Sequence, residues 1–283
     1  MRRGVAVVVA ALCVLSAAQV VPAAPARSGG LIALSIEEGD YSDLYVIRAD
    51  GTGLRRLTKT PKVTEESPTW SSDGRRIAFS RHGQVGGAAS VDVIGVDGSA
   101  PRRIVTVPSG WAFPTWSPDG HWIAFSEWLG DSGLFVVRPD GKGLRKLPGV
   151  GEALRPSWSP DSRSLVYAGD QGLRIIGLNG RGARRLTRSG YSPAWSPDGT
   201  QIVLSDGDPA KIWVVGADGL RARQLTRGTT HDTVPVWSSD GKQIAFVRST
   251  SFGASGRLYV MSADGAHQRA VGPSGAGFPA WQP

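Results

Sequence analysis

The stretch "FPTWSPDGHWIAFS" (113–126) contains the unit from which the fold can be predicted. Its Pro-x-Trp core is followed by Ser-Pro-Asp-Gly (117–120), which has Ser first, Pro second and Gly last, as a type I β-turn prefers. The apolar run "IAFS" (123–126) comes directly after the turn. A tight turn between two short runs of strand-forming residues predicts a pair of antiparallel strands.

The same unit recurs along the whole chain. Its tryptophans are Trp70, Trp116, Trp158, Trp195, Trp237 and Trp281, spaced 46, 42, 37, 42 and 44 residues apart. After the two strands, a third strand such as "IWVV" (212–215) ends in a second tight turn, Asp218-Gly219, and a fourth strand follows, here "ARQLT" (222–226). Asp-Gly is a strong hairpin signal, so each copy reads as four short antiparallel strands.

Four antiparallel strands in about 40 residues, repeated around the chain, are typical of propeller blades. We therefore predict an all-β fold, a six-bladed β-propeller with four antiparallel strands per blade. The first copy opens at "LIALS" (31–35), which matches the second strand of the unit, whereas "FPAWQP" (278–283) matches the first strand. We expect the C-terminal strand to pair with the N-terminal blade, which would close the ring and leave no exposed strand edge.

The first 26 residues have the composition of a secretory signal peptide. Arg2 and Arg3 precede the apolar run 4–15, and "APA" (24–26) offers small residues for cleavage. We assign residues 1–26 to a cleaved signal peptide and 27–283 to the propeller, which predicts a secreted or periplasmic protein. The alternative is an uncleaved membrane anchor over 4–21. Secretion argues against a nucleic-acid partner, and the single cysteine, Cys13, excludes a disulfide framework.

The repeats resemble those of the TolB-like β-propeller family. The resemblance rests on Pro-x-Trp-Ser-Pro-Asp-Gly-x-x-Ile-Ala-Phe-Ser, on the later Ala-Asp-Gly turn and on Arg-Arg-Leu-Thr, and it extends over essentially all of 27–283. It implies a propeller and suggests a protein partner in the cell envelope. TolB itself carries an α/β domain ahead of its propeller, whereas here the repeats begin within about five residues of the predicted cleavage site.

Several recurring side chains are expected to belong to the scaffold. A tryptophan at the same place in every copy is expected to pack between neighbouring blades. The third strands share an aromatic position, with Asp92 and Arg174 as exceptions that the pattern does not explain. Ten basic residues in the fourth strands form a rim that either attracts anionic partners or protects exposed strand edges.

Function is expected on the face with the variable loops, because binding residues usually lie in loops on a rigid scaffold. Residues shortly before each tryptophan should ring the mouth of the central channel. The candidate ligand-binding residues are Glu65, Glu66, Trp111, Phe113, Trp128, Arg155, Tyr191, His231, Asp232 and Phe278. For Trp111 and Phe113 the alternative is that they plug the channel or pack beneath a loop.

These features predict a monomeric, non-enzymatic binding module for a protein, peptide or envelope component. The chain has no Gly-x-Ser-x-Gly elbow, no His-Glu-x-x-His motif and no glycine-rich phosphate loop. The alternatives are a hydrolase or lyase acting on a glycan, with His231 and nearby carboxylates as acid and base, and a gating subunit for a separate protease. Acidic loops at 37–40 and 206–210 offer no complete ligand set, so we predict no metal and no cofactor.

Overall fold

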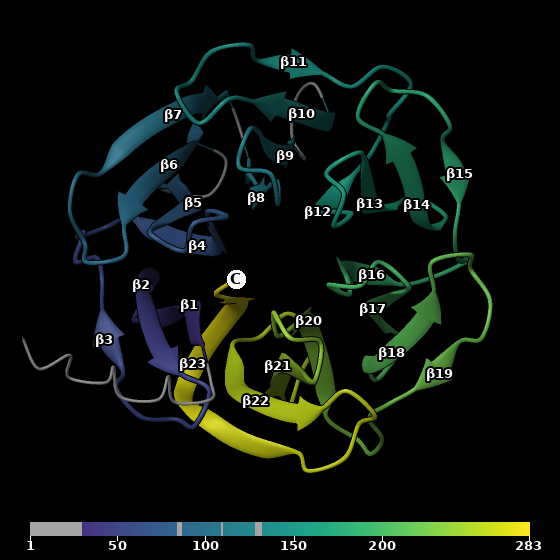
Figure 1. Ribbon diagram of the computed structural model, residues 1–283. Helices are drawn as coiled ribbons and strands as arrows, with labels where there is room; N and C mark the ends of the chain where they lie inside the picture. The colour runs from purple at the N-terminus through teal and green to yellow at the C-terminus, as the bar shows by residue number, and fades with distance from the viewer. Residues whose placement is uncertain (1–29, 84–86, 109, 128–131) are drawn as a thin grey trace, which may run out of the picture.

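The computed structural model describes residues 30–83, 87–108, 110–127 and 132–283, and every regular element in these ranges is a β-strand. The strands form five antiparallel sheets arranged around a central axis (Figure 1). Within the same ranges, no helix of the length and apolarity needed to cross a bilayer is found. The predicted all-β propeller architecture, with four-stranded antiparallel units, is therefore confirmed.

Four sheets have four strands each, with the first strand nearest the axis and the fourth at the rim (Figure 1). The first comprises β4 (Thr64–Trp70), β5 (Arg76–His82), β6 (Ala89–Gly95) and β7 (Arg102–Val107). The second comprises β8 (Thr115–Trp116), β9 (Ile123–Glu127), β10 (Gly133–Val137) and β11 (Arg145–Lys146). The third comprises β12 (Leu154–Trp158), β13 (Ser164–Gly169), β14 (Gly172–Gly177) and β15 (Arg184–Arg185). The fourth comprises β16 (Tyr191–Trp195), β17 (Gln201–Asp206), β18 (Lys211–Gly216) and β19 (Arg223–Gln224).

The fifth sheet has seven strands and joins the two ends of the chain. Its order is β20 (His231–Trp237), β21 (Gln243–Ser249), β22 (Gly256–Ser262), β23 (Arg269–Trp281), β1 (Leu31–Glu38), β2 (Tyr41–Arg48) and β3 (Arg55–Arg56). The early part of β23 pairs with β22, Arg269 opposite Val260. Its end pairs with β1, Trp281 opposite Ile32. The chain's last residues therefore supply an inner strand to the sheet in which its first described residues lie.

The hydrophobic core lies between neighbouring sheets and, for one cluster, between the two halves of the seven-stranded sheet. The described residues form six apolar clusters, each with one of the six repeat tryptophans in it or packed against it. Trp70 donates its indole N–H to the Ala280 carbonyl at 3.0 Å, and Trp158 donates to Thr115 at 3.1 Å, in each case across to the adjacent inner strand. The expectation that these tryptophans pack between units is confirmed for these positions.

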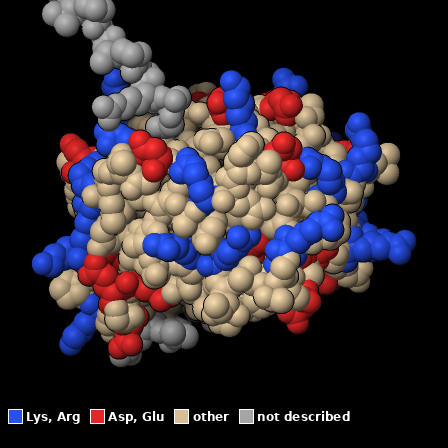
Figure 2. All heavy atoms as spheres, turned by 90° about the horizontal axis from the view of Figure 1, so that it is seen from below, with Lys and Arg blue, Asp and Glu red and all other residues tan. Residues whose placement is uncertain are grey.

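A repeated arginine contact also connects neighbouring units. The first basic residue of each fourth strand donates to a backbone carbonyl beside the tight turn of the next unit. The pairs are Arg55 with Val96, Arg102 with Pro139, Arg145 with Leu178, Arg184 with Ala217, Arg223 with Asp264, and Arg269 with Ala49. Figure 2 shows Lys and Arg distributed over the side of the molecule, with other residues between them. Many basic residues of the predicted rim therefore connect neighbouring units.

The exception at Asp92 in the third strands now has an explanation. At this partly buried position Tyr45 and Phe135 lie beneath Arg56 and Lys146, 5.8 Å and 5.7 Å from the ring centroids. Asp92 instead lies 3.7 Å from both Arg81 and Arg103. Either an aromatic face or a carboxylate can receive a cation from the neighbouring strand. Nothing in the structure accounts for Arg174 at this position.

Candidate functional site

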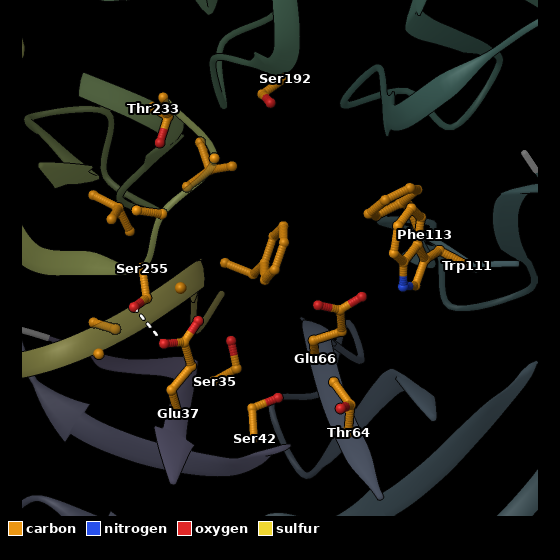
Figure 3. A pocket seen from close by; sticks show the side chains of 18 of the residues that line it. Ser35, Glu37, Ser42, Thr64, Glu66, Trp111, Phe113, Ser192, Thr233 and Ser255 are labelled. Carbon is orange, nitrogen blue, oxygen red and sulfur yellow. Dashed lines mark hydrogen bonds between the residues drawn. The ribbon is translucent and has the colours of Figure 1, made fainter. Parts of the chain in front are cut away.

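A cavity of about 650 Å³ opens around the central axis on the face that carries the long loops. Its wall is built from the starts of the inner strands, from the turn around Gly39 and from the loop around Phe252 (Figure 3). Glu37, Ser42 and Glu66 project into it from β1, β2 and β4. A volume of this size, lined by aromatic side chains together with carboxylates, hydroxyls and one guanidinium, is typical of a ligand site.

A recurring bulge in the inner strands turns one side chain of each repeat toward the axis. The residue before the proline has a positive φ in five repeats: 53° at Ser67, 50° at Arg155, 49° at Ser192, 49° at Val234 and 45° at Phe278. The strand register shifts at the same places. These five residues and Phe113, with the six prolines, line a second space of about 110 Å³ below the first. Strain of this kind persists only where the surrounding structure enforces it.

Arg155 lies at the junction of these two spaces and lines both of them. Its guanidinium lies over two aromatic rings, 4.7 Å from the centroid of Phe113 and 4.5 Å from that of Phe278. Burial lowers the pKa of Arg155 to about 10, and the charge of Glu66 opposes that shift. The three residues, which the sequence analysis selected separately, are thus one cluster on the floor of the cavity.

Glu66, His82 and Trp111 form a second cluster on the wall. The Glu66 carboxylate lies 3.5 Å from the imidazole Nε2 of His82. The rings of His82 and Trp111 meet edge to face, with centroids 6.3 Å apart. Burial is the largest influence on His82 and lowers its pKa, but hydrogen bonding and charge from Glu66 outweigh it, so the pKa is raised overall. The structure thus places His82, which the sequence analysis did not select, behind two residues that it did.

Tyr191 and His231 meet at the exposed side chain of Phe252. The ring of Phe252 lies 5.5 Å from Tyr191 and 5.8 Å from His231, edge to face in both cases. Tyr191 lines the cavity, and burial with the nearby charge of Asp206 raises its pKa to about 12. His231 does not line the cavity, and its Nδ1 accepts the Ala210 amide hydrogen at 3.2 Å.

Glu65 and Asp232 occupy equivalent places in β4 and β20 and lie outside the lining of the cavity. Asp232 is fully buried and accepts two hydrogen bonds from Arg248, at 2.6 Å and 2.9 Å. Glu65 is 1% exposed, lies 3.6 Å from Arg81 and accepts a hydrogen bond from Thr60 at 3.1 Å. Successive side chains of a strand point to opposite faces, so Glu66 points to the cavity whereas Glu65, its neighbour in β4, points away from it.

Trp128, the remaining candidate, lies outside the described residues, as does the predicted signal peptide. Glu37, Asp40, Tyr41 and Phe252 are among the cavity residues that were not selected from the sequence. All four lie at 35–43 or 249–256, in segments that vary between repeats, and this variability is the sequence feature that could have identified them. In the described part of the chain, no three His, Cys, Asp or Glu side chains are grouped so that they could hold a metal ion.

Among protein families, the chain matches the TolB beta propeller domain over residues 9–190 and 185–283. Two similar curated proteins are both called Tol-Pal system protein TolB. The one from Anaeromyxobacter sp. (strain K) is 37% identical over 92 residues, 30% of this chain and 21% of the relative. The one from Nitratidesulfovibrio vulgaris is 30% identical over 125 residues, 41% of this chain and 28% of the relative. The matches therefore span less than a third of either relative's length.

Solved structures share the fold at low sequence identity. TolB from Acinetobacter baumannii superposes with a TM-score of 0.76 at 20% identity, over 90% of this chain and 67% of that one. A putative TolB from Agrobacterium tumefaciens gives 0.69 at 22% identity, over 90% and 92%. An oligogalacturonate lyase in complex with manganese gives 0.57 at 17% identity, over 81% and 73%.

Proposed function

Because the chain belongs to the TolB beta propeller domain family, we propose that it is a six-bladed propeller that binds a polypeptide in the cavity on its long-loop face. In this proposal the seven-stranded sheet counts as two blades that share β23, and the pairing of β23 with β1 closes the ring. Six tryptophans distributed over six apolar clusters support the count of six blades.

The composition of the whole cavity lining, wall and floor together, is the observation that supports this function. Trp111, Phe113, Phe252 and Phe278 supply aromatic surface, and a few carboxylates, hydroxyls and one guanidinium lie between them. Partner recognition typically relies on aromatic and arginine anchors in a desolvated centre with polar groups around it. A cavity of about 650 Å³ accepts an extended segment or a loop tip rather than a whole domain.

The partner is proposed to be a protein of the cell envelope. Two observations support this: the relatives are named as components of a Tol-Pal system, and residues 1–26 have the pattern of a cleaved signal peptide. The protein would accordingly act in the periplasm or after secretion, as a monomer.

No catalytic step is proposed. The Nδ1 of His231 already accepts a backbone hydrogen bond, and both carboxylate oxygens of Asp232 already accept hydrogen bonds from Arg248. His231 also lies outside the lining of the cavity, whereas a general acid or base must lie within hydrogen-bond reach of its substrate. The likeness to the oligogalacturonate lyase, at 17% identity, bears on the fold alone.

The proposal is tested by cross-linked capture from the native envelope followed by quantitative mass spectrometry. Wild type is compared with Trp111→Ala/Phe113→Ala, which removes two aromatic side chains from the cavity lining. The control is His121→Ala, which removes an exposed side chain in a tight turn outside the cavity lining. We expect a discrete protein to be captured by wild type and His121→Ala and lost by the double variant. Equal capture by all three folded proteins would contradict the proposed site.

A further inference from the structure

The floor of the cavity holds a cation, Arg155, that forms no ion pair with any residue that the structure describes. Arg155 is half-buried, and within the described residues its guanidinium makes no hydrogen bond and no ion pair, only the two ring contacts with Phe113 and Phe278. The other arginines discussed above donate to carbonyls or pair with carboxylates. A planar guanidinium held between aromatic faces keeps its N–H edge available for a second, bidentate partner.

A second unsatisfied donor lies on the same wall. The hydroxyl of Tyr191 is buried and has no hydrogen-bond partner among the residues that the structure describes. Tyr191 and Arg155 both line the cavity, and each influences the pKa of the other through charge. A buried polar group without a partner costs free energy, so such groups in a native cavity call for an explanation.

Three carboxylates line the cavity, those of Glu37, Asp40 and Glu66, and within the described residues none of them forms an ion pair with Arg155. Glu66 is held at 3.5 Å by His82 rather than by Arg155. Glu37 accepts a hydrogen bond from Ser255 at 2.5 Å (Figure 3). Both carboxylate oxygens of Asp232 accept hydrogen bonds from Arg248. When His82 is protonated, its pair with Glu66 is neutral, so Glu66 influences Arg155 through its charge but does not contact it as an ion-pair partner.

We infer that Arg155 and Tyr191 bind a carboxylate of the polypeptide that enters the cavity. This inference rests on the proposed function and specifies its ligand, an acidic peptide segment whose carboxylate reaches the floor. The guanidinium would donate two parallel hydrogen bonds, the tyrosine hydroxyl would donate a third, and Phe113 and Phe278 would keep water away from the contact. The carboxylate comes either from an Asp or Glu side chain or from the C-terminus of the segment.

The test begins with selection of peptides from a random display library, with the propeller as bait and with both embedded and free-ended peptides present. Enriched sequences are synthesised with a fluorophore, as free acids and as C-terminal amides, and with each Asp and Glu changed to Asn or Gln. We expect loss of one carboxylate to weaken binding about 10- to 100-fold. Sensitivity to the amide identifies a C-terminal carboxylate, and sensitivity to one side chain identifies an Asp or Glu.

Protein variants complete a double-mutant cycle. Arg155→Gln should weaken the parent peptide by a similar factor, and removal of the carboxylate should then have no further effect. Arg155→Lys keeps the charge but lacks the planar fork, and Tyr191→Phe removes only the hydroxyl, so each should give a smaller loss. Arg185→Gln, which removes an exposed arginine from β15 at the rim, is the matched control and should bind as wild type does.

The outcomes separate this inference from the proposal on which it rests. Peptides that lack any required carboxylate, yet are lost with Trp111→Ala/Phe113→Ala, would overturn the carboxylate site and leave the polypeptide site standing. Additive effects of Arg155→Gln and carboxylate removal would also overturn it. Failure to enrich any peptide would contradict both.

Discussion

Asp232 and Glu65 stand five residues before Trp237 and Trp70, and their carboxylates are held very differently. Asp232 accepts two hydrogen bonds from Arg248 and has the Nζ of Lys211 3.9 Å away. Removing one partner of such a buried pair leaves an uncompensated charge. We predict that Asp232→Asn lowers the free energy of unfolding by about 3 kcal/mol, measured by urea denaturation at pH 7.

Glu65→Gln serves as the comparison for that measurement. Burial raises the pKa of the Glu65 carboxyl, and the Oε2 atom has no hydrogen-bond partner among the described residues. The folded-state pKa of Glu65 therefore lies above the ordinary 4.5. At a pH above the raised value the carboxyl is ionised in the folded and the unfolded chain alike, and there its contribution to the free energy of folding is least favourable. Its neutral isostere should therefore change stability by less than about 1 kcal/mol. Equal losses for the two variants would contradict this distinction.

His82 provides a prediction about pH. Its folded-state pKa is raised by Glu66 above 6.5, so its contribution to stability is present in full below 6.5 and is lost as the pH rises through the raised value. In Glu66→Gln only burial remains as a large influence, and we expect the pKa of His82 to fall below 6.5. An NMR titration of the imidazole measures this. An unchanged pKa would show that the pair does not form.

Spacing along the repeat placed some cavity residues correctly and others wrongly. Spacing from the tryptophans selected Arg155, Phe113 and Phe278, which do meet on the cavity floor. The same spacing selected Glu65 and Asp232, which lie behind the wall, since strand alternation separates neighbours onto opposite faces. Phe252 was not selected because it lies in a loop with no counterpart in other repeats, and only the folded loop brings it to Tyr191.

At the scale of the element, the short fourth strands are stabilised by contacts beyond their own sheet. Arg184 donates to the Ala217 carbonyl of the next sheet at 2.8 Å, whereas its neighbour Arg185 makes no hydrogen bond or ion pair among the described residues. Both are exposed arginines in β15, so their removal changes charge equally.

We predict that Arg184→Ala lowers the unfolding free energy by about 1 kcal/mol and the melting temperature by about 2–4 °C. Arg185→Ala should change the melting temperature by less than about 1 °C. Differential scanning calorimetry measures both. Indistinguishable values would mean that the repeated arginine contacts contribute nothing to joining the units.

Sequence patterns predicted these elements well where the chemistry repeats. The Ser-x-Asp-Gly turns form as expected, with Ser117 accepting the Gly120 amide hydrogen on its carbonyl at 2.9 Å. The basic residues of the fourth strands were predicted only as an edge-protecting or anion-attracting rim. Five of their carbonyl partners lie 33–41 residues along the chain and the sixth lies 220 residues away, and spacing alone does not reveal a side-chain contact to a backbone group.

In the whole molecule, the two ends of the chain are joined by strand pairing in the seven-stranded sheet. The end of β23 pairs with β1, and Ala280 accepts the indole hydrogen bond of Trp70 from the next sheet. We predict that deletion of residues 278–283 exposes the edge of β1, lowers the melting temperature by more than about 10 °C and promotes association. Calorimetry and size-exclusion chromatography measure these effects. A truncated chain that stays monomeric with the wild-type melting temperature would contradict the proposed closure.

Whether the cavity face binds a polypeptide of the envelope can be measured by photo-crosslinking in cells. A benzophenone amino acid replaces Phe252, which is 64% exposed at the cavity, or His121, which is exposed in a tight turn outside the cavity lining. We predict a specific protein adduct from position 252 that disappears in the Trp111→Ala/Phe113→Ala background, and none from position 121. Equal adducts from both positions, or an adduct at 252 that survives the double substitution, would contradict the claim.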